Sequence, residues 1–332
     1  MGEPSAQPQR QDATDIQHLL EGNFRFVEGV YVNEDVSDEL DTKFTGAMFS
    51  EKWKENQDAD DDDEVEWMKV QKTWYLSLYG YESEQQFAEF LGTRNVMLDA
   101  GCGKGYKAAW LARHNPDAIV IGSDLSDSVF AAAKRYADIP NLVFVMGDIA
   151  KTGFRAAAFD FISCDQVLHH TISPPDTLRE FHRIATEDAV LNTYVYSKKG
   201  LPRELLDEHF ITSHAKKEMD TKEIWESSDQ LTQLGKTLSE LNINITVPDM
   251  PLLNIKGGEY DLQRFIYWNF IKCYWNEQVG FDMSKECNFD WYSPSIAYRY
   301  SQEEFLAMCS DTGWKNDFLH AEEACYSGRF NK

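Results

Sequence analysis

One aspartate and three glycines stand together in the first third of the chain, at a spacing that can hold a ligand. Asp99 ends an apolar run, and Gly101, Gly103 and Gly105 alternate after it. Glycines let the backbone approach a ligand closely because they have no Cβ, and the start of a following helix offers free N–H groups. The aspartate would repel a pyrophosphate and attract an ammonium group. The pattern therefore indicates a site for a ligand that carries an amine.

The apolar residues on either side of the glycines predict a strand before them and a helix after them. Residues 96–98 form a short buried run, and residues 108–112 give the helix an apolar body. A strand, a glycine turn and a helix form the opening unit of a nucleotide-binding α/β sheet. Tyr106 occupies the position at which a dinucleotide fingerprint has its third glycine, so a dinucleotide is the weaker interpretation.

Two segments carry a resemblance to a known family. The stretch from Asp99 to Gly105, D-A-G-C-G-K-G, resembles the first motif of class I S-adenosylmethionine (SAM) dependent methyltransferases. Residues 167–171, V-L-H-H-T, resemble the segment after the fourth strand in one subgroup of that family. An ordinary βα turn of another α/β protein is the alternative interpretation. The resemblance covers about 95–197 and 301–330, and it implies SAM as the cofactor and methyl transfer as the reaction.

The same regions predict the fold. Five alternating strand and helix patterns predict a doubly wound α/β sheet. The resemblance implies a Rossmann-like sheet of seven strands that ends in an antiparallel hairpin, formed by residues 314–320 and 324–330. The SAM-binding domain then comprises residues 95–197 and 299–332.

Three further parts are predicted from composition and apolar spacing. Residues 1–45 are expected to form a flexible arm with a short hairpin, and residues 46–94 a helical cover that includes a solvated acidic loop at 58–64. Residues 198–298 are too long for a loop. We expect them to form a mainly helical lid at the carboxyl edge of the strands, where ligands bind in such sheets.

Two helices are predicted inside this insertion. Leucines and Ile224 recur at helical spacing up to Leu241, and residues 260–275 are predicted to form a second helix crowded with aromatic side chains. These aromatic side chains predict a pocket for a flat acceptor molecule. Alternatively, they are the core of the lid itself or a homodimer surface.

Acidic residues follow the predicted second and third strands. Asp124 lies about 20 residues after the glycines, where an acid accepts hydrogen bonds from ribose hydroxyls in such folds. It could instead cap the next helix. The resemblance places Asp148 beside the adenine amino group, and it adds the neighbouring residues Leu125 and Ile149 to the cofactor site.

The resemblance also assigns the reacting end of the cofactor. Asp99 and the turn at Gly101 and Gly103 would hold the methionine end, and Asp165 and Gln166 would lie near the sulfonium. An aspartate near a cation is electrostatically reasonable, but Asp165 could equally cap the next helix.

Two adjacent histidines, His169 and His170, follow the predicted fourth strand beside the expected place of the methyl group. Methyl transfer requires the nucleophile, methyl group and sulfur to be held in line. A hydroxyl or acidic carbon would also need a base, and histidine suits that role near neutral pH. The alternative is that both histidines bond the backbone and are structural.

Composition limits the partners. The 332 residues carry a net charge of −24, which disfavours nucleic acid and anionic lipid as partners. No stretch is long and apolar enough to span a membrane, and residues 1–12 lack the apolar core of a signal peptide. Six scattered cysteines, with no C-x-x-C pair, argue against a zinc ribbon and for free thiols in a reducing cytoplasm, and we expect no metal.

We therefore expect a cytoplasmic enzyme that methylates a small molecule on O, N or C. The acidic surface weakly favours an acceptor with positive charge. The alternatives are a non-catalytic SAM-binding protein, a nicotinamide-dependent oxidoreductase and a tRNA-modifying methyltransferase.

Overall fold

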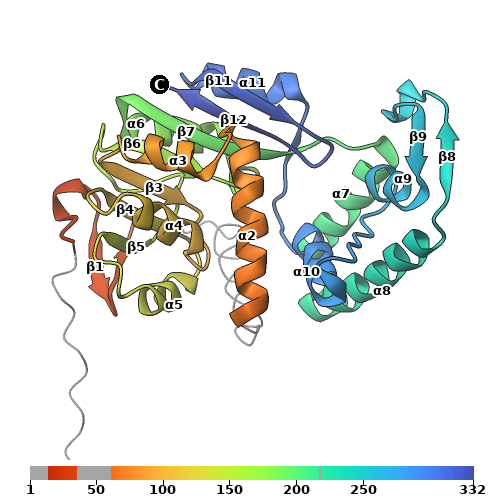
Figure 1. Ribbon diagram of the computed structural model, residues 1–332, viewed down its shortest axis with the longest axis horizontal. Helices are drawn as coiled ribbons and strands as arrows, with labels where there is room; N and C mark the ends of the chain where they lie inside the picture. The colour runs from red at the N-terminus through yellow and green to blue at the C-terminus, as the bar shows by residue number, and fades with distance from the viewer. Residues whose placement is uncertain (1–13, 36–60, 217) are drawn as a thin grey trace, which may run out of the picture.

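The computed structural model describes residues 14–35, 61–216 and 218–332, and it places one large sheet at the centre of the molecule (Figure 1). The strands follow one another across the sheet as β1 (Phe24–Val27), β2 (Val30–Asn33), β5 (Leu142–Met146), β4 (Ile119–Asp124), β3 (Val96–Ala100), β6 (Phe159–Cys164), β7 (Ala185–Ser197), β12 (Cys325–Asn331) and β11 (Lys315–Ala321). A two-residue strand, β10 (Arg299–Tyr300), also pairs with β7.

Helices cover both faces of this sheet, as a doubly wound fold requires. One face packs against α2 (Asp61–Leu78), α3 (Glu84–Leu91), α4 (Tyr106–His114) and α5 (Ser128–Arg135). The other face packs against η1 (Gln17–Leu19), α6 (Pro174–Ile184) and α11 (Gln302–Asp311). The strands are therefore buried on both sides: β5 is apolar along its whole length, and every residue of β6 is buried.

The strand order reverses between β3 and β6. From β3 the chain moves outward through β4 to β5, and it then returns to β6 on the other side of β3 and continues to β7. All of these neighbours are parallel, so their carboxyl ends share one edge. Ligands of open α/β sheets bind outside the carboxyl ends at such a reversal. The fold thus brings the end of β3 and the end of β6 to the expected binding position.

The closing hairpin is confirmed. Strand β12 runs antiparallel to β7 on one side and to β11 on the other. The strands from β5 to β11 lie within a sheet of ten strands among the described residues, so the predicted count of seven is too small. Strand β7, which lies beside this hairpin, runs from Ala185 to Ser197.

The N-terminal segment differs from its prediction. The hairpin of β1 and β2 belongs to the sheet, because β2 pairs in parallel with β5 and extends the sheet beyond the predicted seven strands. Val30 is fully buried, and the amide of the buried Asn33 donates to the carbonyls of Lys151 and Thr152. Residues 24–33 are therefore not part of an arm; residues 1–13 and 36–45 of that predicted arm lie outside the described residues.

Two helices form the described part of the predicted cover. Helix α3 begins after Ser83, whose hydroxyl accepts from the Gln86 N–H. The acidic loop prediction is wrong for residues 61–64, which form the first turn of α2. Carboxylates are favoured at a helix N-terminus because they face the positive end of its dipole. Residues 46–60 lie outside the described residues.

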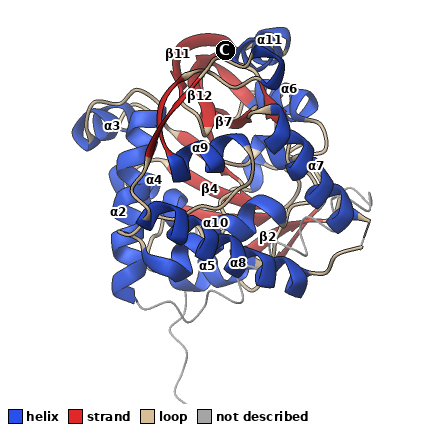
Figure 2. Cartoon of the chain, turned by 90° about the vertical axis from the view of Figure 1, so that its right-hand side faces the viewer, coloured by secondary structure: helices blue, strands red, loops and turns tan. Residues whose placement is uncertain are grey.

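Residues 198–298 are mainly helical and lie to one side of the sheet (Figure 1); Figure 2 views the molecule from that side. The elements of this insertion are α7 (Leu201–Ala215), α8 (Thr221–Glu240), β8 (Asn244–Val247), η4 (Pro251–Leu253), β9 (Gly258–Asp261), α9 (Leu262–Asn269) and α10 (Gly280–Tyr292). Helix α8 confirms the first predicted helix. Among the described residues, no helix has the length and apolar character needed to cross a bilayer.

The second predicted helix of the insertion is wrong at both ends. Its first residues belong to β9, the helix α9 stops at Asn269, and α10 was not predicted. The chain beyond α9 is irregular because its backbone groups form hydrogen bonds with side chains and not with the backbone of a helix. The Gln263 amide donates to the Cys273 carbonyl at 2.9 Å, and the Lys272 N–H donates to the Tyr292 hydroxyl at 3.1 Å. Local apolar spacing carries no information about these contacts.

A glycine in α8 allows this irregular segment to pack closely. A Cβ added at Gly235 would lie 2.2 Å from the Cys273 carbonyl oxygen. Replacing an ordinary helical glycine by alanine stabilises a protein by roughly 0.5–1 kcal/mol. We expect Gly235→Ala to be destabilising instead, with a loss of roughly 1–3 kcal/mol in the free energy of unfolding, because the chain at Cys273 must move away from the new Cβ. Urea unfolding followed by tryptophan fluorescence measures this, with Ser239→Ala on the exposed face as the control. A stabilised Gly235→Ala variant would contradict the packing described.

Candidate functional site

The glycine turn joins the ends of β3 and β4 to the chain after β6. The N–H of Gly101 donates to the Ser123 carbonyl at 2.7 Å. Gly101 has a φ of +82°, and a Cβ there would lie 2.3 Å from Cγ2 of Val167. Gly105 precedes α4 with a φ of +78°, and a Cβ there would lie 2.7 Å from the Phe144 ring. Both positions need glycine for conformation and for space.

Asp99 lies beneath this turn and is only 1% exposed. Its Oδ2 atom has no hydrogen-bond partner among the described residues. Burial raises the pKa of this carboxyl to about 7, although the nearby charge of Lys107 lowers it. An unpaired buried carboxylate is costly. The end of β3 therefore presents a negative potential that a cationic ligand group would relieve.

A buried ion pair stands across the reversal point from Asp99. Lys107, in the first turn of α4, donates to the Asp165 carboxylate, and its side chain is 11% exposed. Burial alone would lower the pKa of Lys107, but Asp165 raises it above its usual range. The Tyr79 hydroxyl also donates to Asp165 at 2.7 Å. Asp165 is not a helix cap, since Ser173 caps α6.

Sequence reasoning missed Lys107 and Tyr79. Lys107 lies two residues beyond the third glycine, so its position in the first turn of the helix was a usable signal. Tyr79 follows Tyr75 at the i+4 spacing that brings two side chains onto one helix face. Tyr75 is buried and shares hydrogen bonds of 3.0 Å with Ser163 and Asn192, so it packs on the sheet. Trp74 is half-buried and contacts the edge of the Tyr194 ring.

Asp124 ends β4 beside the glycine turn. Its Oδ2 accepts from the Gly103 N–H at 2.8 Å, and its Oδ1 accepts from the Ser126 N–H and hydroxyl. It is therefore not a helix cap; α5 follows Asp127, and Ser126 does not cap it either. Asp124 is half-buried. Its carboxylate fixes the turn, and its place at the strand end agrees with the predicted ribose contact, which stays a prediction.

The remaining predicted cofactor residues lie at the ends of β4, β5 and β6. Leu125 and Asp148 are half-buried, and Ile149 is buried. The Asp148 carboxylate accepts from the Ala150 N–H at 2.8 Å. Gln166 has a φ of +64°, and its amide donates to Asp165 at 3.1 Å. The predicted cofactor residues thus gather along one edge of the sheet, although their roles stay predictions.

The two histidines have different surroundings in η3 (Leu168–His170). His169 is fully buried, and neither ring nitrogen makes a well-formed hydrogen bond among the described residues. Its ring centroid lies 3.8 Å from that of Tyr196. Burial, together with the His170 ring, lowers the pKa of His169 well below its usual value. His169 is therefore neutral at physiological pH and packs as an aromatic ring.

His170 is half-buried and faces the end of the insertion. Its Nδ1 lies 2.7 Å from the Ile296 carbonyl oxygen. Because a carbonyl can only accept, Nδ1 carries the proton in this contact and Nε2 is the basic nitrogen. The Tyr298 N–H donates to the His169 carbonyl at 2.9 Å. The histidine turn is thus held by the chain that returns from the insertion.

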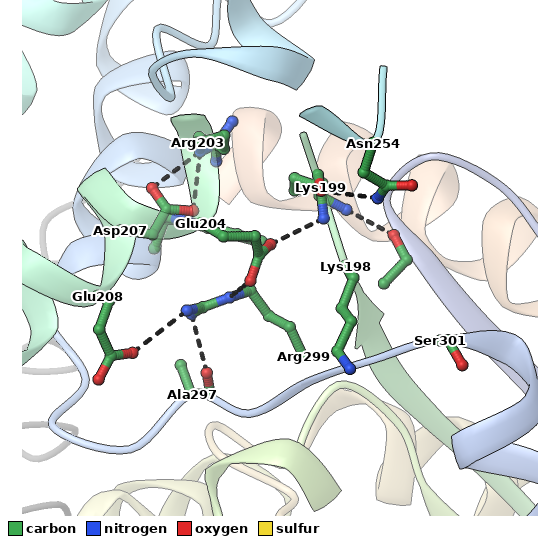
Figure 3. A network of polar contacts seen from close by, with 12 residues as sticks. Lys198, Lys199, Arg203, Glu204, Asp207, Glu208, Asn254, Ala297, Arg299 and Ser301 are labelled. Carbon is green, nitrogen blue, oxygen red and sulfur yellow. Dashed lines mark hydrogen bonds and ion pairs between the residues drawn. The ribbon is translucent and has the colours of Figure 1, made fainter. Parts of the chain in front are cut away.

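The two crossings between sheet and insertion are tied together by charged groups (Figure 3). Arg299, on the returning chain, donates to Glu204 of α7 at 2.7 Å. The other oxygen of Glu204 accepts from the Lys199 N–H at 2.7 Å on the outgoing chain. Asn254 donates to the Lys199 carbonyl at 3.0 Å. These contacts fix the insertion beside the carboxyl ends of β6 and β7.

No metal site is found at this edge, since no cluster of three His, Cys, Asp or Glu side chains suited to a metal occurs among the described residues. All six cysteines are free.

The burial of Asp99 gives a pH-dependent prediction. Its folded pKa of about 7 exceeds the unfolded value of about 4. Between these values the unfolded chain releases a proton that the folded chain keeps, so wild-type stability falls as pH rises. Asn cannot ionise, so its variant escapes this loss. We expect the free energy of unfolding of Asp99→Asn, relative to that of the wild type, to rise by roughly 2–3 kcal/mol between pH 5 and pH 8. Urea unfolding of both proteins at both pH values tests this. The same difference in free energy of unfolding between variant and wild type at pH 5 and pH 8 would contradict the burial of this carboxyl.

Comparison with known proteins agrees with this arrangement. Residues 98–192 match the family model described as a methyltransferase domain. A malonyl-[acyl-carrier protein] O-methyltransferase of Herminiimonas arsenicoxydans is 39% identical over 72 residues, which are 22% of this chain and 26% of that protein. A probable methyltransferase of Aspergillus luteorubrus, ltbC, is 27% identical over 192 residues, which are 53% of this chain and 61% of that protein.

Among solved structures, a SAM-dependent methyltransferase from Aquifex aeolicus covers 79% of this chain and 96% of its own, with 14% identity and a TM-score of 0.41. The chain spans between about a quarter and three fifths of the length of the two curated relatives above. The matched residues contain the glycine turn, Asp124, Asp148 and the histidine turn. The similarity to methyltransferase domains thus covers the part of the sheet that contains these residues.

Proposed function

We propose that this protein transfers a methyl group from SAM to O, N or C of a small-molecule acceptor held between the sheet edge and the insertion. One observation carries the proposal: the reversal point of the sheet combines a glycine turn, a buried carboxylate at Asp99 whose Oδ2 has no hydrogen-bond partner among the described residues, and Asp124 at the next strand end. These groups have the chemistry that an amino acid joined to a nucleoside requires.

The residues at this edge fit SAM. The ammonium group would find negative potential from Asp99, and the backbone of residues 101–105 can approach the ligand without side chains in the way. Asp124 would accept from ribose hydroxyls, and Asp148 and Ile149 would border the adenine. When bound, SAM supplies an activated methyl group on a sulfonium. The protein's contribution is to bind, align and exclude water.

His170 is the proposed general base for an acceptor that must lose a proton. The Ile296 carbonyl orients its ring and leaves Nε2 as the basic nitrogen. His169 cannot share this role, because it is fully buried against Tyr196 and its pKa is lowered by burial. It is instead a positioning residue that supports the turn from below. Of the two histidines, we therefore propose His170 as the base and His169 as its support.

Binding of S-adenosylhomocysteine (SAH) tests the cofactor site. Asp165→Asn would leave the Lys107 charge unbalanced at the reversal point. That cation would repel the ammonium group, so we expect SAH affinity to fall at least tenfold, about 1.4 kcal/mol. Isothermal titration calorimetry measures the change. The matched control is Asp117→Asn, which removes an exposed carboxylate in the loop before β4. Equal affinity in wild type and Asp165→Asn, or no binding by wild type, would contradict the proposed site.

The His170→Gln variant distinguishes an enzyme from a SAM-binding protein that does no chemistry. Loss of a general base costs typically 10²–10⁴-fold in rate, so labelled methyl transfer from SAM into a metabolite mixture should fall by at least 10². SAH affinity should stay within threefold, because the variant keeps the cofactor residues. His209→Gln, on the exposed side of α7, is the control. Unchanged transfer in His170→Gln would remove His170 from the mechanism, and absence of transfer by wild type would favour the non-catalytic alternative.

A further inference from the structure

Three basic side chains surround one aromatic ring inside the insertion. Lys272 Nζ lies 4.6 Å from the centroid of the Trp291 ring, Arg203 Cζ lies 4.9 Å from it, and Lys199 Nζ lies 5.7 Å from it. All three side chains are buried, and Arg203 is completely so. Buried cations are rare unless they are paired, and the sheet-edge site does not use these three.

The hydrogen bonds of these cations are unequal. Lys199 Nζ donates to the Ser197 hydroxyl and to the carbonyls of Glu323 and Ala324, which uses its three protons. Arg203 donates from Nε to both oxygens of Asp207 at 2.8 Å and from Nη1 to the Tyr267 carbonyl.

Two donor groups remain without partners. The Nη2 of Arg203 is buried and has no hydrogen-bond partner among the described residues. Lys272 Nζ has only ring contacts, with no hydrogen bond or ion pair to any described residue; these rings are Trp291, Tyr267 and Tyr274. Buried donors without acceptors carry a desolvation cost. Both groups can therefore donate to an acceptor atom that the chain does not itself supply.

The charges in this cluster do not balance. Asp207 is the fully buried carboxylate among them, and it already accepts from Arg203 and from Trp291 Nε1 at 2.7 Å. Burial lowers the pKa of Lys272 to about 8, while Cys287, Asp290 and Asp207 raise it and Arg203 lowers it further. Burial and Arg203 lower the pKa of Lys199 to about 7, while Cys325 and Glu204 raise it and Lys272 lowers it. The three buried basic groups thus outnumber the one fully buried carboxylate, in a chain whose net charge is −24.

Aromatic rings connect this cluster to the histidine turn. The Trp291 and Tyr196 ring centroids are 4.3 Å apart, and the Tyr196 centroid lies 5.6 Å from that of His170. Tyr196 belongs to β7, whose carboxyl end leads directly into Lys199 and α7. Figure 3 shows Lys199 and Arg203 where α7 leaves the sheet, beside the returning chain at Arg299. The cations therefore lie two ring contacts from the proposed base.

We propose that Lys272 and Arg203 bind an anionic group of the methyl acceptor, a carboxylate or a phosphate, beside Trp291. This subsite rests on the proposed function, since it names the class of acceptor for the same enzyme. The acidic surface favours a cationic acceptor, but surface charge acts at long range and is screened by salt. Buried donors act on the group that they contact. The charge of Lys272 and Arg203 therefore determines which group of the acceptor binds beside Trp291.

Simple probes test the subsite without knowledge of the natural acceptor. Benzoate and phenyl phosphate carry the two anionic groups, and benzamide is the neutral analogue. Titration calorimetry of the full chain at pH 7 should show benzoate or phenyl phosphate binding at least tenfold more tightly than benzamide. The tighter of the two anions identifies the group. Equal affinity for all three probes would overturn the proposal.

Charge variants locate the binding. We expect Lys272→Met to lose at least tenfold in affinity for the anionic probe and Lys272→Arg to stay within about threefold of wild type. Lys222→Met removes an exposed lysine of α8 and should change nothing. SAH affinity should be the same in all of these variants. Wild-type affinity of Lys272→Met for the anion would overturn the proposal. Absence of SAH binding together with tight anion binding would instead contradict the proposed function alone.

The pH dependence of the wild type gives a readout that needs no variant. Lys272 and Lys199 lose their protons as pH rises, with pKa values of about 8 and about 7. A bound anion favours the charged lysines, so binding at pH 8 should take up protons, and affinity should fall between pH 6.5 and pH 9. Calorimetry in buffers of different ionisation enthalpy detects the uptake. Affinity and proton balance that do not change over this range would contradict an anion held by these lysines.

Discussion

The negative charge that the sheet buries at the ends of β3 and β6 is the constraint on which the rest of the structure depends. Asp99 and Asp165 end neighbouring parallel strands, and a single lysine, Lys107, neutralises only Asp165. Burying an uncompensated carboxylate opposes folding, so a position of this kind persists where it serves binding. The glycine turn covers Asp99, Tyr79 donates to Asp165 from the turn after α2, and Lys107 lies in the first turn of α4. The neighbouring elements thus all contribute contacts to these two carboxylates.

The interior of the insertion has the opposite kind of charge from the sheet edge. Its interior gathers Lys199, Arg203 and Lys272 around Trp291, while the sheet edge gathers carboxylates. The histidine turn and Tyr196 lie between the two regions. A cationic cofactor on one side and an anionic acceptor on the other would each meet complementary charge. The two ligands would then be oriented before any proton moves. Holding the reacting atoms in line lowers the barrier to methyl transfer.

The sequence predicted the elements that depend on local patterns. Apolar runs located the parallel strands, and the closing hairpin was implied by the family resemblance. The N-terminal hairpin was placed wrongly, because its pairing with β5 is a long-range contact that no local pattern encodes. Helix α9 was extended too far for the same reason, since Gln263 and Tyr292 satisfy the backbone beyond it. In the site, the acids at the strand ends were visible as motifs. The roles of Lys107 and Lys272 were not, because folding alone brings Lys107 to Asp165 and Lys272 to the Trp291 ring.

A crystal structure of the complex with SAH tests the central claim most directly. The account predicts that SAH lies across the carboxyl ends of β3 and β4, with its amino-acid end at the turn of residues 101–105 and its ribose at Asp124. Its sulfur should face the histidine turn and the insertion. SAH bound elsewhere on the molecule, with Asp99 and the glycine turn untouched, would contradict the account.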